Sequence, residues 1–224
     1  KNKEGFKYHR KDLKMLLLRS IFGTLGILCN FYAVDHLLVS DASMLNKLSP
    51  FFVIICSSLF LKEKATTVQK ISIIIAFIGS LFVIKPSLNI LNNVNSLIGV
   101  LGALGAGIAY TCVRQLGKQG VSGPKIVFFF SCFSCLSVVP YLIFNYQPMT
   151  LSQTAILIWA GLMAAGGQFA ITAAYNNAAG KDISIFDYSQ IVFAAILGFV
   201  FLNQIPDLMS IIGYVIIILA ALFS

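Results

Sequence analysis

Residues 42–61 of the 224-residue chain read ASMLNKLSPFFVIICSSLFL, an apolar run with a single charged side chain, Lys47. A helix of about 20 residues is about 30 Å long, which matches the hydrocarbon core of a lipid bilayer. The run therefore predicts a helix that crosses a membrane.

Similar apolar runs follow one another along the chain, separated by short segments of charged and turn-forming residues. Hydrophobic residues make up 58% of the sequence and charged residues 11%, whereas a soluble domain has about 25% charged residues. The sequence therefore predicts an all-α, polytopic membrane protein and excludes an ordinary soluble enzyme. The eight predicted transmembrane helices are residues 16–37, 42–61, 68–84, 97–115, 125–145, 155–179, 182–202 and 207–223.

The net charge of +8 comes from lysines and arginines that lie mostly between these runs. If residues 1–15 form a cytoplasmic basic segment and the chain crosses eight times, 14 of the 16 basic residues lie on the cytoplasmic side. We therefore expect a multi-pass protein of a bacterial cytoplasmic (inner) membrane rather than a nucleic-acid-binding protein. Lys85 is then the one basic residue on the outer side, and Lys47 lies inside a span.

The residues predict no cofactor and no metal. All five cysteines fall inside apolar runs, where a thiol packs as a small hydrophobic group, and these include the pair Cys132 and Cys135. The sequence contains no Walker A glycine loop, no HExxH and no GxSxG. ATP-driven pumping and the enzyme classes that use these motifs are therefore disfavoured.

A repeat is visible when residues 29–82 are laid over residues 170–223. The ungapped alignment has 11 identities in 54 positions, among them Asp41 with Asp182. The first span of one copy crosses the membrane outward and the first span of the other crosses it inward. The copies therefore form an inverted-topology repeat of the kind found in many secondary transporters. We expect residues 16–86 to be the last three helices of one five-helix repeat and residues 97–224 to be a complete second one. Two further helices would then precede residue 1, ten in all.

Several of these segments resemble a known family. The first copy reads DASML at residues 41–45 and LFLKEK at residues 59–64, and the second reads FDYSQ at residues 186–190 and FLNQIPD at residues 201–207. This pattern resembles the EamA-type transporters of the drug/metabolite transporter superfamily. The resemblance implies ten helices in two inverted units, a central cavity, and movement of small metabolites such as amino acids, often outward. The chain departs from the family where Gln204 stands in the place that Glu63 holds in the first copy.

Polar side chains on apolar helices are the candidates for a substrate cavity. A charged group in the bilayer costs about 2.5–3.5 kcal/mol on insertion scales, so such groups usually face a cavity or one another. Lys47 and Asp187 are predicted to pair across the cavity; the alternatives are that Lys47 reaches the outer surface and that Asp187 lies at the inner one. The predicted cavity residues are Asn30, Asn46, Lys47, Gln168, Tyr175, Asn176, Asp187 and Tyr188.

Three further residues are predicted to shape the helices. Pro50 lacks an N–H and permits a kink in its span. Gly99 and Gly107 belong to a small-residue pattern that lets helices pack closely.

The function predicted from these features is a secondary transporter or facilitator, not an enzyme. It would export small polar metabolites, such as amino acids or related compounds, by alternating access at a cavity between the two repeats. Its partners would be the substrate and the bilayer, and the sequence leaves open proton coupling and a homodimer. Two other classes stay open, an intramembrane enzyme acting on a lipid and a channel or scaffold subunit.

Overall fold

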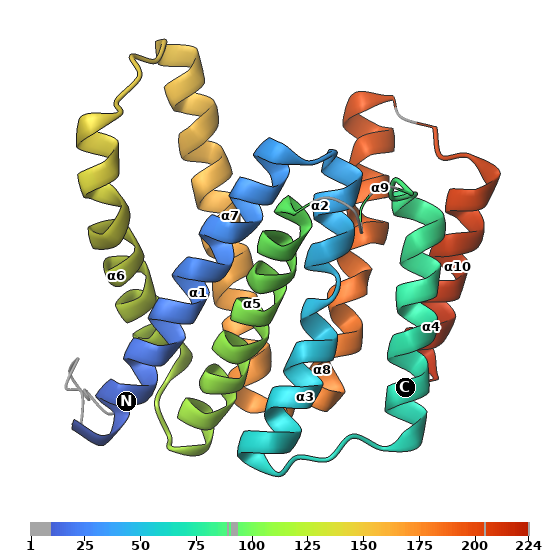
Figure 1. Cartoon of the computed structure of the whole chain (residues 1–224), viewed down its shortest axis with the longest axis horizontal. Coiled ribbons are helices and arrows are strands. Elements are labelled where there is room, and N and C mark those ends of the chain that lie inside the picture. The colour runs from blue at the N-terminus through green and yellow to red at the C-terminus, as the bar shows by residue number, and fades with distance from the viewer. Residues whose placement is uncertain (1–9, 89, 91–93, 204, 224) are drawn as a thin grey trace. The chain divides into compact units, whose positions relative to one another are not determined.

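The computed structural model describes residues 10–88, 90, 94–203 and 205–223. Within these residues every long element is a helix (Figure 1). In order these are α1 (Arg10–His36), α2 (Val39–Asn46), α3 (Ser49–Leu61), α4 (Thr67–Ile84), α5 (Asn95–Lys118), α6 (Gly123–Phe144), α7 (Leu151–Asn177), α8 (Gly180–Ile183), the 3-10 helix η2 (Ser184–Tyr188), α9 (Ser189–Leu202) and α10 (Leu208–Leu222).

The lengths of these segments confirm the all-α, multi-span prediction. Seven helical segments in the described part of the chain are long and apolar enough to cross a membrane, with α2 and α3 counted together and α8 to α9 counted together. The eighth, α10, is equally apolar but has 15 residues. All eight coincide with the predicted runs.

Two predicted spans differ from expectation because each is interrupted. The run at 42–61 divides into α2 and α3 at Lys47 and Leu48, and the run at 182–202 passes through the 3-10 turn η2. Pro50 lies in the first turn of α3, a position where its missing N–H costs nothing, so a new helix begins there.

Local capping fixes the ends of the interrupted spans and the starts of the helices that follow them. Thr66 and Asp207 cap the first turns of α4 and α10, and their side chains accept from the N–H groups of Gln69 and Ser210. Lys62 and Asn203 end α3 and α9 in the left-handed conformation, with φ of 58° and 52°. The alignment of the sequence repeat matches Thr66 with Asp207 and Lys62 with Asn203, so equivalent positions carry equivalent caps.

The helices form two compact units. The first comprises α1 up to Ile21 and the segment Cys112–Ala178, and the second comprises Phe22–Thr111 and the chain from Ala179 onward. In the first unit the guanidinium of Arg19 lies 3.9 Å from the centre of the Phe130 ring. These are packing units, and the division into two repeats stays a prediction.

Helices α4 and α10 form the core of the second unit. They run antiparallel, because the last residues of α4 meet the first residues of α10 (Figure 1). At their crossing a Cβ on Gly213 would lie 2.6 Å from the carbonyl oxygen of Gly79, so the contact depends on glycine. The buried residues around this crossing form one apolar cluster: Ile73, Ala76, Ile185, Tyr188, Ile191, Ile217 and Ala220.

The glycines of α5 also mark close helix contacts in the second unit. A Cβ on Gly99 would lie 2.6 Å from Leu45, and one on Gly107 would lie 2.5 Å from Phe52. Helix α5 therefore packs against α2 and α3 through the positions that the small-residue pattern singled out.

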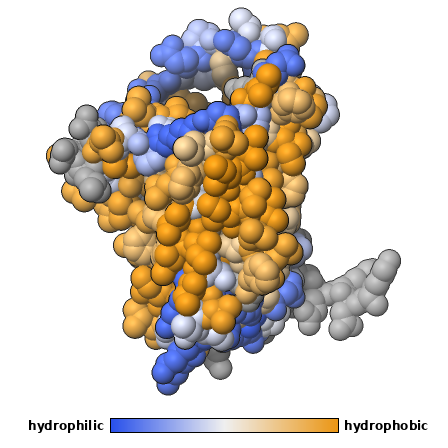
Figure 2. Space-filling view, turned by 90° about the vertical axis from the view of Figure 1, so that its right-hand side faces the viewer, coloured by the Kyte–Doolittle hydropathy of each residue, from blue (hydrophilic) through white to orange (hydrophobic). Residues whose placement is uncertain are grey.

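The outward faces of α4 and α10 are strongly apolar. Figure 2 shows a broad hydrophobic band with hydrophilic residues at both of its ends. Ile71, Ile74, Ile211 and Val215 are all at least 47% exposed on these helices. Apolar side chains in this density are solvated by lipid tails rather than by water, which agrees with membrane-spanning helices.

Candidate functional site

A cavity of about 340 Å³ lies within the second unit. Helices α2, α4, α9 and α10 supply its wall, so segments 43–84 and 190–214, which are far apart in the sequence, meet there. Its lining combines polar residues at the end of α2 with apolar residues of the other helices: Ser43, Asn46, Lys47, Val83, Ile84, Gln190, Ile191, Ala194, Ala195 and Tyr214.

Lys47 supplies the charge in this cavity. The residue is 9% exposed, and it sits where α2 ends and α3 has not yet begun. Its ammonium donates to the side-chain oxygen of Gln190 at 2.8 Å and to the main-chain oxygen of Asp187 at 3.2 Å. The Asp187 carboxylate is also close enough to attract it electrostatically. These contacts reduce the cost of holding an ammonium among apolar helices.

Tyr188 holds the main chain of Lys47 in place from the apolar cluster. The tyrosine is completely buried in the apolar cluster, and its hydroxyl donates to the main-chain oxygen of Lys47 at 3.0 Å. The carbonyl groups at the end of a helix lack partners within the helix, so this bond satisfies one of them. Ile191 belongs both to the cluster and to the cavity wall, so the cluster closes the cavity on that side.

Two neutral polar side chains stand beside Lys47. Ser43 and Asn46 lie one helical turn apart on α2 and are both partly buried. Neither side chain has a hydrogen-bond partner among the residues that the structure describes. Their donors and acceptors are therefore available to a molecule in the cavity.

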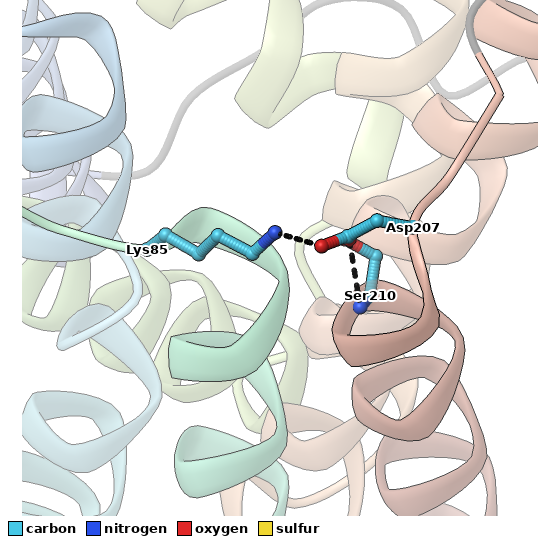
Figure 3. A network of polar contacts seen from close by, with 3 residues as sticks. All are labelled: Lys85, Asp207 and Ser210. Carbon is cyan, nitrogen blue, oxygen red and sulfur yellow. Dashed lines mark hydrogen bonds and ion pairs between the residues drawn. The ribbon is translucent and has the colours of Figure 1, made fainter.

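A second cavity, of about 410 Å³, lies next to the first, and Ala195 and Tyr214 line both. It contains the ion pair of Lys85 with Asp207, in which nitrogen and oxygen are 2.5 Å apart (Figure 3). Asp207 also accepts hydrogen bonds from the N–H and the hydroxyl of Ser210. The hydrogen bond from Lys85, followed by those from Ser210, lowers the pKa of Asp207 to about 2.

Two further polar contacts anchor the ends of the interrupted spans. The carboxylate of Asp41 accepts from both the N–H and the hydroxyl of Ser87 at 2.6 Å, which joins the start of α2 to the segment after α4. Asp182, at the start of α8, accepts from the amide of Gln69 at 2.7 Å. Both interrupted segments are therefore held at their first turn.

The structure brings together four of the eight predicted cavity residues, namely Asn46, Lys47, Asp187 and Tyr188. Lys47 donates to the main-chain oxygen of Asp187, whereas the predicted contact is a pair of the two charged side chains across the cavity, which stays a prediction. Asn30 is in the same unit, where its main chain borders the contact of α1 with Gly102.

The other three predicted residues belong to the first unit. Gln168 donates to Thr172 at 3.0 Å, Tyr175 is completely buried, and Asn176 donates to the main-chain oxygen of Val121 at 3.0 Å. Their place in a substrate cavity stays a prediction, and so does the role of the five predicted residues in the second unit.

The predicted cavity residues lack three polar residues that line this cavity, Ser43, Gln190 and Tyr214. Gln190 lies three residues after Asp187, so the group of polar residues in that span could have indicated it. Tyr214 is a lone phenol in an otherwise apolar run, and such a group in a membrane helix is itself a signal.

Together, the apolar helices and the partly open, polar-lined cavity define a multi-span membrane protein with a candidate binding site among its helices. The model of the EamA-like transporter family matches residues 2–85 and 95–224. The chain belongs to this family of small-molecule transporters, which confirms the resemblance seen in the sequence.

Individual relatives agree with this assignment. The pseudopaline exporter CntI of Pseudomonas aeruginosa is 32% identical over 97% of this chain and 77% of its own length. A riboflavin transporter of Brucella anthropi is 26% identical over 92% of this chain and 74% of its own length. One protein of known crystal structure matches 99% of this chain and 78% of its own, with a TM-score of 0.81 and 12% identity, which supports the fold alone.

Proposed function

We propose that the protein is a secondary transporter that exports small polar metabolites across a bacterial cytoplasmic membrane. The family supports transport, and the similarity to a pseudopaline exporter supports the outward direction. The similarity to riboflavin transporters indicates that the family accepts more than one kind of solute, so the substrate has to be inferred from the cavity.

The observation that carries this proposal is the cavity around Lys47. Its volume of about 340 Å³ is at the lower end of the usual range for ligand pockets, about 300–1,000 Å³, and suits a small metabolite. A buried lysine inside a membrane helix is costly, and such residues usually mark the path of a substrate or ion. The cavity unites one charge, several neutral polar groups and an apolar wall, which is the composition of a specific binding site.

The interrupted spans support a mechanism of alternating access. In secondary transporters, inverted repeats place discontinuous helices at the substrate site. Here α2–α3 and α8–α9 are discontinuous, contact each other at Lys47 and Tyr188, and end in left-handed caps at aligned positions of the repeat. We infer that they are equivalent helices of two inverted repeats, residues 16–86 and 97–224, within a ten-helix arrangement.

Transport in proteoliposomes tests the proposal. Vesicles containing the protein are loaded with a panel of polar metabolites, and the exchange of each labelled compound is followed. Saturable exchange that accelerates with unlabelled substrate on the opposite side is expected for a carrier. Flux without saturation would indicate a channel, and the absence of flux for every compound would contradict the proposed function.

A further inference from the structure

We propose that Lys47 binds a carboxylate of the substrate, so that the cavity selects metabolites with a carboxylate group. The inference rests on the proposed transport function and names the substrate chemistry of that same cavity.

The hydrogen bonds of Lys47 leave part of its charge available. An ammonium group has three N–H donors, and the two acceptors of Lys47 are neutral oxygens, those of Gln190 and of the Asp187 main chain. The third N–H has no acceptor among the described residues, although the side chain is nine-tenths buried and lines the cavity. An anionic oxygen in the cavity would complete its coordination with a charge-assisted hydrogen bond.

The neighbouring groups suit the second oxygen of a carboxylate. Ser43 and Asn46 offer a hydroxyl and an amide without protein partners in the described part of the chain. Both can donate to an anion. The apolar part of the lining, which includes Val83, Ile84 and Ala194, suits the remainder of a small organic molecule.

The charge balance favours a carboxylate over a phosphate. Asp187 already places a negative charge near Lys47. A second carboxylate brings one more negative charge, whereas a phosphate carries nearly two at neutral pH. The additional repulsion from Asp187 disfavours the phosphate, since charges in this environment are weakly screened.

The first test measures the preference of the cavity for anions without knowledge of the substrate. Ser43→Cys is introduced into the full chain after its five native cysteines are replaced by alanine. Two thiol reagents of similar size are compared, the anionic sulfonatoethyl and the cationic trimethylammonioethyl methanethiosulfonate. Their rate ratio cancels any change in the reactivity of the thiol itself.

Lys47→Met should lower the ratio of anionic to cationic rates by about tenfold or more, because a nearby charge acts strongly at low effective dielectric. Lys70→Met is the matched control, since Lys70 is exposed on α4, and should leave the ratio unchanged. An unchanged ratio in Lys47→Met would overturn the proposal. So would a thiol that neither reagent reaches, because the cavity would then be closed to ligands.

The second test compares acids with their amides in proteoliposomes. The pairs are aspartate with asparagine, histidine with histidinamide, and nicotinate with nicotinamide. For any pair that is transported, the acid should compete at least about tenfold better than the amide, and Lys47→Met should abolish this difference. If saturable flux persists without a preference for the acid, the carboxylate proposal fails while the transporter proposal stands. If no compound of any class is transported, the proposed function itself fails.

Discussion

Lys47 and Lys85 belong to the same unit, yet they hold their charges in different ways. Lys85 is half exposed and contacts the carboxylate of Asp207 directly, at the junction of α4 and α10. Lys47 is nine-tenths buried and is held by neutral oxygens. The charge of Lys85 is therefore neutralised by a direct ion pair and screened by solvent. Lys47, which the nearby Asp187 carboxylate attracts, donates its hydrogen bonds to neutral oxygens and keeps one N–H for a molecule in the cavity. The comparison predicts that Lys47 serves binding and that Lys85 makes a small contribution to structure.

The largest effect is expected for Lys47→Met, which keeps the length of the side chain and removes its charge. Saturable transport should fall by about 100-fold or more, the loss expected when a charge-assisted contact with the substrate is removed. The midpoint of thermal unfolding in detergent should change much less than transport, because the substitution removes the cost of burying an ammonium together with the contacts that offset it. Equal loss of transport and of stability would contradict a binding role, and Lys70→Met is the control for both measurements.

Tyr188→Phe tests how Lys47 is positioned. The substitution leaves the buried main-chain oxygen of Lys47 without its donor, which should lower the free energy of unfolding by about 1–3 kcal/mol. The KM for transport should rise as Lys47 loses its fixed position, while the maximal rate changes less. Denaturation and transport measured on the same preparation check both effects, and Tyr32→Phe, in the same unit but outside both cavities, is the control for loss of a phenol.

Asp187→Asn tests whether the carboxylate of Asp187 carries a coupled proton or only balances the charge of Lys47. The substitution removes the carboxylate and preserves the main-chain oxygen that accepts from Lys47. If Asp187 carries a coupling proton, exchange should remain within about threefold of the wild-type rate while accumulation driven by a proton gradient is lost. Wild-type accumulation in this variant would exclude Asp187 as the proton carrier.

The smallest effect is expected at the exposed ion pair. Asp207→Asn removes the charge but retains a residue that caps helices well, so its effect on the unfolding midpoint should be slight. Because the pKa of Asp207 is lowered to about 2, the pair contributes fully above the unfolded-state value of about 3.9 and is lost as the pH falls through about 2. The difference between wild type and Asp207→Asn should therefore be constant from about pH 8 to about pH 5 and decline below about pH 4. A difference that already disappears between pH 8 and pH 6 would show that another group is responsible.

The positions of the spans can be predicted from the sequence because they depend on local properties. Inside lipid every main-chain polar group must be bonded within the segment, so an apolar run of sufficient length forms a helix. The predicted boundaries are less accurate where polar residues extend a helix. α7 begins at Leu151 rather than 155 because Thr150 and Gln153 form a capping box outside the apolar run.

The partners of Lys47 are decided only by the tertiary structure. The alignment of the repeat matches Asp187 with Asn46, next to Lys47, and the faces of the span are assigned from the sequence as if a continuous α-helix ran from 182 to 202. The chain instead passes through a 3-10 turn with about three residues per turn, so faces assigned from about 3.6 residues per turn no longer hold across it. The turn brings the main-chain oxygen of Asp187 and the side chain of Gln190 to Lys47.

The sequence by itself thus determined the membrane helices, the family and the polar residues among which a site had to be sought, because hydropathy and short motifs are properties of neighbouring residues. It did not determine which of those residues would meet. Contacts between distant parts of the chain, such as Lys47 with Gln190 and Lys85 with Asp207, depend on where each helix breaks and how closely its glycines let it approach another. Those distances are set by packing in three dimensions, and only the folded arrangement of α2, α4, α9 and α10 specifies them.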